Sequence, residues 1–256
     1  TQNVAVGNYA LDALTSGDYN VAVGHLALSA QTTGTRNIAI GYQAMVTNTT
    51  STENVAMGSY ALKMNTTGDG NTAIGDAALN ANTTADNNTA IGNQTLKTNT
   101  TGANNTAVGR EALYANTTGL LNVAIGKDAL KANTDATSNT AVGSGSMDAN
   151  TTGAYNTAIG TDSLTENTTG DFNVALGRAA MQNNTTADSN VAIGRNAMYA
   201  NTTGTRNLAI GALAYDASDT ENDNIAIGHG AMSENTAGGT KNIAIGVYAA
   251  DALTSG

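Results

Sequence analysis

Residues 190–206 read NVAIGRNAMYANTTGTR, and the other parts of the chain are variations on this stretch. Its first asparagine returns every 17 residues along the 256-residue chain, with one spacing of 18 before the last copy. The fifteen copies are Asn3, Asn20, Asn37, Asn54, Asn71, Asn88, Asn105, Asn122, Asn139, Asn156, Asn173, Asn190, Asn207, Asn224 and Asn242. A fixed short period indicates units that bury their apolar side chains only by stacking on their neighbours. Residues 1–256 are therefore expected to form one tandem-repeat array.

Each repeat is numbered here from this asparagine as position 1. Positions 1–5 then read Asn, Val/Ile/Thr, Ala, Val/Ile and Gly, positions 8 and 9 read Ala and Leu/Met, and positions 12–15 read Asn-Thr-Thr-Gly. The chain has no Cys, Pro or Trp and a single Phe, so disulfides and large aromatic side chains cannot build its interior. No 3.6-residue period is sustained, which argues against helices. We predict an all-β fold, a parallel β-solenoid of fifteen 17-residue coils with a thin, alanine-rich interior.

Each coil is expected to hold two short strands. The first covers positions 1–4, as in Asn122–Ile125, and ends at Gly126, where we expect a turn that only glycine tolerates well. The second covers positions 8–11, as in Ala129–Ala132. The Asn-Thr-Thr-Gly segment is expected to form a wider turn, in which the glycine takes a positive φ and the Asn and Thr side chains bond the nearby backbone.

The pattern of side chains also predicts which positions are buried. None of the 10 basic and 20 acidic residues occupies positions 1–5, 8, 9 or 12, so these positions are expected to be buried or to form turns. Position 4 is aliphatic or Met in every copy, so positions 2 and 4 are predicted to face the interior together with position 9. Position 3, alanine from Ala5 to Ala244, would then point outward. Such a flat outward face predicts close packing of a second chain; the alternative is that alanine fits a tight bend inside one chain.

Threonine replaces the aliphatic residue of position 2 in five copies, which are Thr72, Thr89, Thr106, Thr140 and Thr157. Threonine is β-branched like valine, so the strand is expected to survive the exchange. In the interior each hydroxyl would need a partner, which a threonine ladder or a bound water would supply.

The runs Asn122–Ala129 and Asn190–Ala197, which read Asn-Val-Ala-Ile-Gly-x-x-Ala, resemble the head repeats of YadA-like trimeric autotransporter adhesins. Similar 17-residue arrays with Asn-Thr-Thr-Gly turns occur in phage tail fibres and in large bacterial surface proteins. The resemblance extends over all fifteen copies. It implies a left-handed parallel β-roll in which three identical chains pack side by side, and an extracellular location on a cell surface or a virion.

The sequence offers little chemistry. His25 and His229 both occupy position 6 without a second His or a Cys nearby, so we expect no metal site. A nucleophile elbow and a phosphate-binding loop are missing, so we expect no enzyme, no catalytic residue and no cofactor. A net charge of −10 without a basic stripe argues against nucleic acid as a partner. No apolar run approaches the roughly 20 residues of a membrane span, so this segment is not expected to insert into a membrane.

The Asn-Thr-Thr triplets match the N-glycosylation acceptor, at Asn48, Asn65, Asn82, Asn99, Asn116, Asn150, Asn167, Asn184 and Asn201. An asparagine that returns once per coil is instead expected to form an internal amide ladder. The best candidates for contact with a host-surface glycan or protein are tyrosines at variable positions, namely Tyr9, Tyr42, Tyr60, Tyr114, Tyr199 and Tyr248. A single exposed tyrosine, however, is common and needs no function.

Three functions fit these patterns. The first is a homotrimeric, non-enzymatic shaft or head segment of a surface adhesin or phage tail fibre, which supplies reach, stiffness and multivalent attachment. The second is a self-polymerising extracellular filament, because residues 252–256 followed by residues 1–3 would continue the repeat and the segment is expected to come from a longer array. The third is an ice- or surface-binding solenoid, which would need Thr-x-Thr on one exposed strand. The adjacent threonines of each wide turn would instead point to opposite faces.

The structural ladder predicted for the middle of the chain combines three repeat positions. Its members are Asn54, Asn71, Asn88, Asn105 and Asn122 at position 1, Ala56, Ala73, Ala90, Ala107 and Ala124 at position 3, and Gly58, Gly75, Gly92, Gly109 and Gly126 at position 5.

Overall fold

The computed structural model of the chain describes residues 2–217, 219–234 and 239–251. These residues are all-β, with fifteen parallel strands in a β-solenoid and no helix in the described part. They fall into two compact units, Thr1–Lys127 and Asp128–Gly256, which are taken separately below. The region of the 18-residue spacing includes residues 235–238, and the continuity of residues 252–256 with the N-terminal repeat likewise falls outside the described residues.

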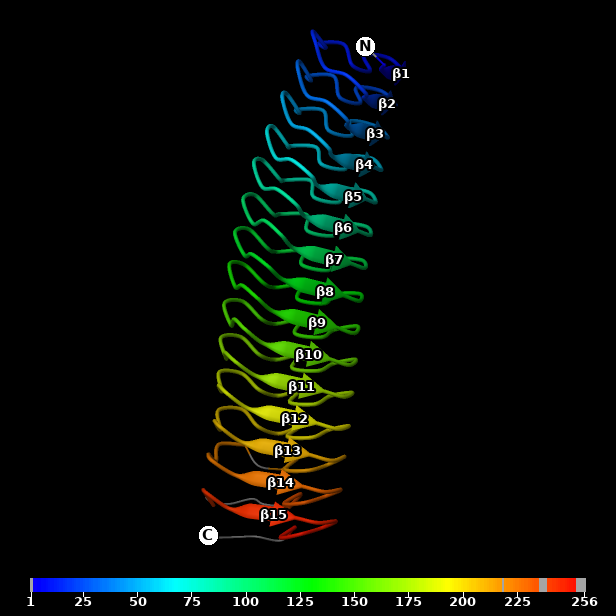
Figure 1. Cartoon of the computed structure of the whole chain (residues 1–256). Helices are drawn as coiled ribbons and strands as arrows, with labels where there is room; N and C mark the ends of the chain where they lie inside the picture. The colour runs from blue at the N-terminus through cyan, green and yellow to red at the C-terminus, as the bar shows by residue number, and fades with distance from the viewer. Residues whose placement is uncertain (1, 218, 235–238, 252–256) are drawn as a thin grey trace. The chain divides into compact units, whose positions relative to one another are not determined.

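Every strand has three residues and occupies positions 2–4 of its repeat. Unit 1 holds β1 (Val4–Val6), β2 (Val21–Val23), β3 (Ile38–Ile40), β4 (Val55–Met57), β5 (Thr72–Ile74), β6 (Thr89–Ile91), β7 (Thr106–Val108) and β8 (Val123–Ile125). Unit 2 holds β9 (Thr140–Val142), β10 (Thr157–Ile159), β11 (Val174–Leu176), β12 (Val191–Ile193), β13 (Leu208–Ile210), β14 (Ile225–Ile227) and β15 (Ile243–Ile245). Within each unit, successive strands lie side by side in chain order, as the labels in Figure 1 show.

Neighbouring strands pair in parallel with each position opposite the same position of the next coil. In unit 1, for example, Ala73 of β5 is opposite Ala90 of β6. In unit 2, Ala175 of β11 is opposite Ala192 of β12. The 17-residue period therefore becomes a set of columns, each made of one repeat position. A side chain at a given position meets its counterparts in the coils on either side.

The predicted alternation of the strand is present, but its two faces are the reverse of the prediction. The alanine of position 3 is buried in every strand from β2 to β15, whereas positions 2 and 4 are half-buried or exposed throughout. Position 9 is buried as predicted from Leu11 to Met232, with Leu113 and Met181 fully inaccessible to solvent. The coil is so thin that a methyl group fills the strand side of its interior. The prediction of an outward alanine face was therefore wrong. Alanine lies inside one chain, as in the alternative, but in a strand rather than in a tight bend.

The second predicted strand, positions 8–11, was also wrong, because this segment forms turns. In the coil of β11, Ala179 and Met181 adopt φ of 55° and 51°, which a β-strand cannot contain. The segment still stacks on its neighbours, since the Ala179 N–H donates to Thr161 O at 3.0 Å and the Met181 N–H donates to Ala197 O at 3.0 Å. These two N–H groups point to opposite neighbouring coils. The turn therefore contributes a hydrogen-bonded column without being a strand.

The turn predicted at position 5 is confirmed, and the glycine conformation predicted at position 15 is wrong. All fifteen position-5 glycines have φ between 132° and 141°, a region that is open to glycine almost alone. The described glycines of position 15 do not have a positive φ. They fit for another reason, because a Cβ on Gly102 would lie 2.6 Å from Asn99 Oδ1 and close to the carbonyl oxygen of Gly119.

Candidate functional site

The main candidate surface is the outward face of the strands, which we call the outward ladder and define as the side chains of positions 2 and 4. Position 4 is Val, Ile, Leu or Met throughout. In unit 1 Ile74 and Ile91 are 37% and 38% exposed, and in unit 2 Ile159 and Leu176 are 39% and 42% exposed. Parallel sheets normally have both faces covered, and large exposed apolar surfaces are typical of interaction sites, which makes the outward ladder the main candidate surface. The sequence interpretation missed this surface because it assigned these side chains to the interior.

Threonines at position 2 add hydroxyl groups to the outward ladder. Thr72, Thr89 and Thr106 stand next to one another in unit 1, and Thr140 is opposite Thr157 in unit 2. Their side chains are half-buried on the outward side of the strand. The expectation of an interior partner therefore no longer applies, because the hydroxyls can be hydrated or bond a molecule that covers the ladder.

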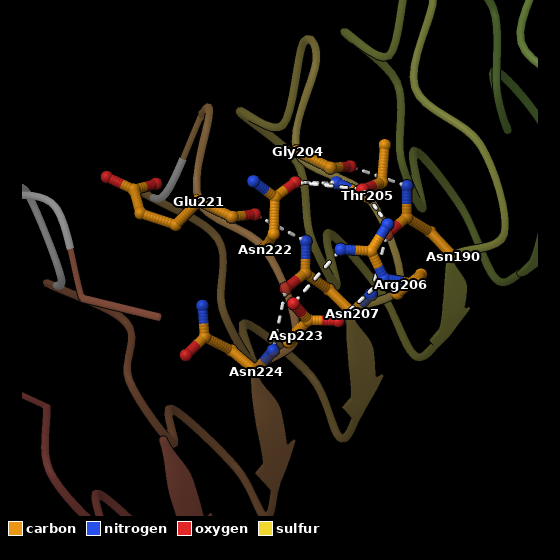
Figure 2. A network of polar contacts seen from close by, with 9 residues as sticks. All are labelled: Asn190, Gly204, Thr205, Arg206, Asn207, Glu221, Asn222, Asp223 and Asn224. Atoms are coloured by element: carbon orange, nitrogen blue, oxygen red, sulfur yellow. Dashed lines mark hydrogen bonds and ion pairs between the residues drawn. The ribbon is translucent and has the colours of Figure 1, made fainter. Parts of the chain in front are cut away.

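The asparagines of position 1 form a buried column behind the strands. Figure 2 shows it in unit 2, where the Asn207 N–H donates to Asn190 Oδ1 at 2.8 Å and the Asn224 N–H donates to Asn207 Oδ1 at 2.9 Å. Each side-chain amide also closes its own coil, since Asn190 Nδ2 donates to Gly204 O and Asn207 Nδ2 donates to Glu221 O, both at 2.7 Å. Each of these asparagines thus bonds one coil to the next and also joins the beginning and the end of its own coil.

The predicted ladder residues of unit 1 have this same arrangement. Asn54, Asn71, Asn88, Asn105 and Asn122 are fully buried, and the N–H of each donates to Oδ1 of the preceding member at 2.8–3.0 Å. The alanines Ala56, Ala73, Ala90, Ala107 and Ala124 are fully buried beside them. The glycines Gly58, Gly75, Gly92, Gly109 and Gly126 turn the chain at the end of each strand with φ of 133–138°. These residues form the scaffold that presents the outward ladder.

A second amide column runs through the Asn-Thr-Thr-Gly turns. Asn99 Nδ2 donates both to Asn82 Oδ1 at 3.0 Å and to Gly102 O at 2.9 Å. The threonine after each of these asparagines also bonds across coils, since Thr83 Oγ1 donates to Thr100 O at 3.2 Å. All nine asparagines that match the glycosylation acceptor are fully buried. In the folded chain their amide nitrogens are inaccessible to a glycosyltransferase.

The candidate tyrosines are divided among separate places. Tyr42 is 43% exposed and belongs to an aromatic column in unit 1, where it stacks on His25 at 5.5 Å and meets Tyr60 edge to face at 5.3 Å. Tyr9 continues this column, 6.3 Å from His25. His25 thus has aromatic neighbours rather than metal ligands, and the described residues contain no group of three or more His, Cys, Asp or Glu that could hold a metal.

Tyr114, Tyr199 and Tyr248 do not belong to that column, and Tyr60 lies at its end. Tyr60 and Tyr114 each have an ammonium group over the ring, Lys63 Nζ at 5.1 Å and Lys97 Nζ at 5.5 Å from the ring centres. Tyr199 is half-buried in unit 2, and Tyr248 meets His229 edge to face at 5.2 Å. The structure therefore joins Tyr42 and Tyr60 in one surface and leaves Tyr114 and Tyr199 outside it.

The clearest electrostatic pair lies at the edge of the ladder in unit 2. Arg206 binds Asp223 of the next coil through two bonds, Nε to Oδ1 at 2.6 Å and Nη2 to Oδ2 at 3.0 Å, as Figure 2 shows. The hydrogen bond and the charge of Arg206 lower the pKa of Asp223 below its ordinary value of 3.8. Because this pKa is lower in the folded chain, the pair stabilises the fold above pH 3.8. That stabilisation is lost as the pH falls through the folded pKa.

We expect a carboxyl titration followed by NMR to show this shift directly. Asp223 should titrate below 3.8 in the native chain and return towards that value in Arg206→Gln, because the guanidinium is the main cause of the shift. Arg36→Gln, which removes the comparable ion pair with Glu53 in unit 1, serves as a control and should leave the titration of Asp223 unchanged. An unchanged Asp223 midpoint in Arg206→Gln would contradict the assignment.

No cleft or pocket of ligand size is found in the part of the chain that the structure describes. In the same residues there is no helix long and apolar enough to cross a membrane. The candidate surfaces are therefore the outward ladder and its borders rather than an enclosed site. No protein-family model and no curated protein matches the chain.

Proposed function

We propose that the chain is a non-enzymatic structural segment of an extracellular fibre, the shaft or head of a surface adhesin or phage tail fibre, in which three copies pack together through the outward ladder. The observation that carries this proposal is position 4 of that ladder, which holds an exposed or half-buried aliphatic or Met side chain in all fifteen strands. A parallel sheet with aliphatic side chains on its outer face is more stable when another surface packs against that face and removes the side chains from water. A second and third copy of the same ladder supply a cover that repeats at the same interval.

The inner columns support the mechanical side of the proposal. In unit 2, for example, the coils of β11 and β12 are joined by strand hydrogen bonds, by the Asn190 N–H to Asn173 Oδ1 and by Asn201 Nδ2 to Asn184 Oδ1 of the wide turns. A load along the stacking direction is therefore shared by several bonds per coil. Assembly of three copies multiplies any weak contact with a glycan or protein, because the contacts act together.

Two methionines of the same coil provide a test. Met57 of β4 lies in the outward ladder and is 40% exposed, whereas Met64 lies in the turn segment and is 43% exposed. If copies cover the ladder, we expect hydrogen peroxide to oxidise Met57 several-fold more slowly than Met64, as measured by peptide mass spectrometry. In a single uncovered chain the two residues are matched in exposure and should oxidise at similar rates.

A variant whose outward ladder carries added charges, and which should no longer pack against other copies, makes this test specific. Ile40→Lys with Ile74→Lys places a charge on each side of Met57 and leaves the interior untouched, since both isoleucines point outward. We expect Met57 to become as reactive as Met64 in this variant while its circular dichroism spectrum is retained. Equal oxidation of both methionines in the native protein would overturn the proposal.

A further inference from the structure

At β11 and β12 of unit 2 the outward ladder has borders of opposite charge. We call the two residues before each position-1 asparagine the N-flank and the residue after each position-5 glycine the C-flank. At β11 the N-flank carries Asp171 and the C-flank carries Arg178. At β12 the N-flank carries Asp188 and the C-flank carries Arg195. Two successive levels of the ladder are therefore acidic along one border and basic along the other.

These charges do not neutralise each other within one chain. Arg178 and Arg195 are exposed, and their guanidinium groups have no hydrogen-bond or ion-pair partner among the described residues. The extended backbone of the strand separates the two borders by about 13 Å, at about 3.3 Å per residue from Asn173 to Gly177. The two arginines are thus available to a second molecule.

Symmetry decides which border a second copy presents. A rotation about an axis parallel to the stacking direction brings the N-flank of one copy against the C-flank of the next, at the same level. An antiparallel pair instead brings N-flank to N-flank and C-flank to C-flank. The first arrangement pairs Asp171 with Arg178 and Asp188 with Arg195, whereas the second brings like charges together, which is unfavourable.

We propose that a second copy of this chain docks parallel and in register, with the acidic N-flank of β11 and β12 bound to the basic C-flank of the same strands in its neighbour. This inference rests on the proposed self-association and adds its direction and the residues that set it. A stacked aromatic pair strengthens the contact: the rings of Tyr155 and Phe172, 5.1 Å apart and more than half exposed, lie on the N-flank of β10 and β11.

The inference is confined to unit 2. At β5 in unit 1 both borders are acidic, with Asp69 on the N-flank and Asp76 on the C-flank. Parallel docking brings these two carboxylates near each other, so this level gives no attraction. We therefore assign the recognition between copies to the β11 and β12 levels of unit 2.

Two reciprocal variants test the proposal. The first, Arg178→Asp with Arg195→Asp, makes both borders acidic, and the second, Asp171→Arg with Asp188→Arg, makes both borders basic. Position 16, which holds both aspartates, is alanine at Ala154, so the fold accepts a residue without a carboxylate there. We expect each variant to raise the dissociation constant of the assembly at least about tenfold at low salt and less at high salt. Sedimentation gives the constant, and circular dichroism reports the fold.

Mixing the two variants is the decisive step. In a particle of three chains, two of the three contacts then join unlike chains and bring an acidic border against a basic one. We therefore expect particles that contain both chains and a dissociation constant well below that of either variant alone. Thr186→Asp with Thr203→Asp adds negative charge at exposed wide-turn positions and serves as a control that should assemble normally. Asp135 already occupies this repeat position.

The possible failures are distinguishable. In an antiparallel assembly the native contacts are already between like charges, so normal assembly of both variants would overturn the parallel register while leaving self-association intact. Weakened variants that do not recover on mixing would overturn the pairing between borders. A native chain that is itself a monomer would instead contradict the proposed function.

Discussion

Substitution of Gly160 by alanine is expected to destabilise the fold by roughly 3 kcal/mol or more, a large effect for a single methyl group. Gly160 has φ of 141°, where an L-residue is strained. A Cβ at this position would also lie 2.6 Å from the carbonyl carbon of Gly177 in the next coil, closer still to its oxygen. Because that neighbour is backbone, the clash cannot be relieved by a rotamer change. Thermal unfolding followed by circular dichroism measures the loss.

Gly145→Asn provides the matched control. Gly145 occupies position 7 with φ of 66°, and the same position of another coil holds Asn196 with φ of 57°. The Cβ would meet only the end of the Asp162 side chain, which can move. We expect a change within about 1 kcal/mol. Equal unfolding midpoints for Gly160→Ala and Gly145→Asn would contradict the role given to the position-5 turn.

Asn88→Ala is expected to destabilise the fold by roughly 1.5–4.5 kcal/mol, the second large effect. Asn88 is fully buried, its Nδ2 donates to Gly102 O at 2.9 Å and its Oδ1 accepts the Asn105 N–H at 2.9 Å. Removal of the amide leaves the buried Asn105 N–H without its partner, at about 1–3 kcal/mol, and removes one of the two bonds to Gly102 O, at about 0.5–1.5 kcal/mol, since Asn99 Nδ2 still donates to that oxygen. Urea unfolding followed by circular dichroism gives the difference.

Asn93→Ala, five residues further on, is the control that measures the cost of replacing an exposed asparagine by alanine. Asn93 is exposed, and its only side-chain bond in the described structure is a long one, 3.4 Å from Nδ2 to Asp76 Oδ2. Asn93→Ala is therefore expected to change stability by less than about 0.5 kcal/mol. A comparable loss in both variants would show that the buried column contributes no more than an exposed side chain.

The period of the sequence was sufficient to predict the parallel solenoid and its position-5 turn. A spacing of 17 residues puts every copy of a residue next to its counterpart, so Asn88 meets Asn71 and Asn105 whatever the path of the coil. Glycine in all copies of position 5 corresponds to a φ that other residues rarely adopt. These two conclusions needed only repetition and the conformational freedom of glycine.

The orientation of the strand could not be predicted in the same way. Alternation shows that Val174 and Leu176 share a face and that Ala175 lies on the other, but not which face is inside. Large aliphatic side chains usually point inward, and here the interior is already filled by buried Met181 and by the asparagine columns. Only the backbone path reveals that a methyl group is all that fits. The candidate surface was missed for this reason.

The prediction of a second strand at positions 8–11 was wrong for a different reason. Bulky residues at a positive φ are uncommon, so a sequence such as Ala180-Met181 offers no signal for left-handed backbone. The strain is offset by contacts with the coils on either side, which form only when the array is stacked. Such a conformation depends on the neighbouring coils rather than on local preference.

The mass of the chain in solution, measured by light scattering after size exclusion over a range of concentrations, tests the central claim most directly. The account predicts a discrete particle of three chains, each of 25.6 kDa, because an outward ladder of aliphatic side chains is covered by its counterparts. A mass that grows with concentration would point to an open filament. A stable monomer of 25.6 kDa would contradict the account, because the outward ladder would then be left to water.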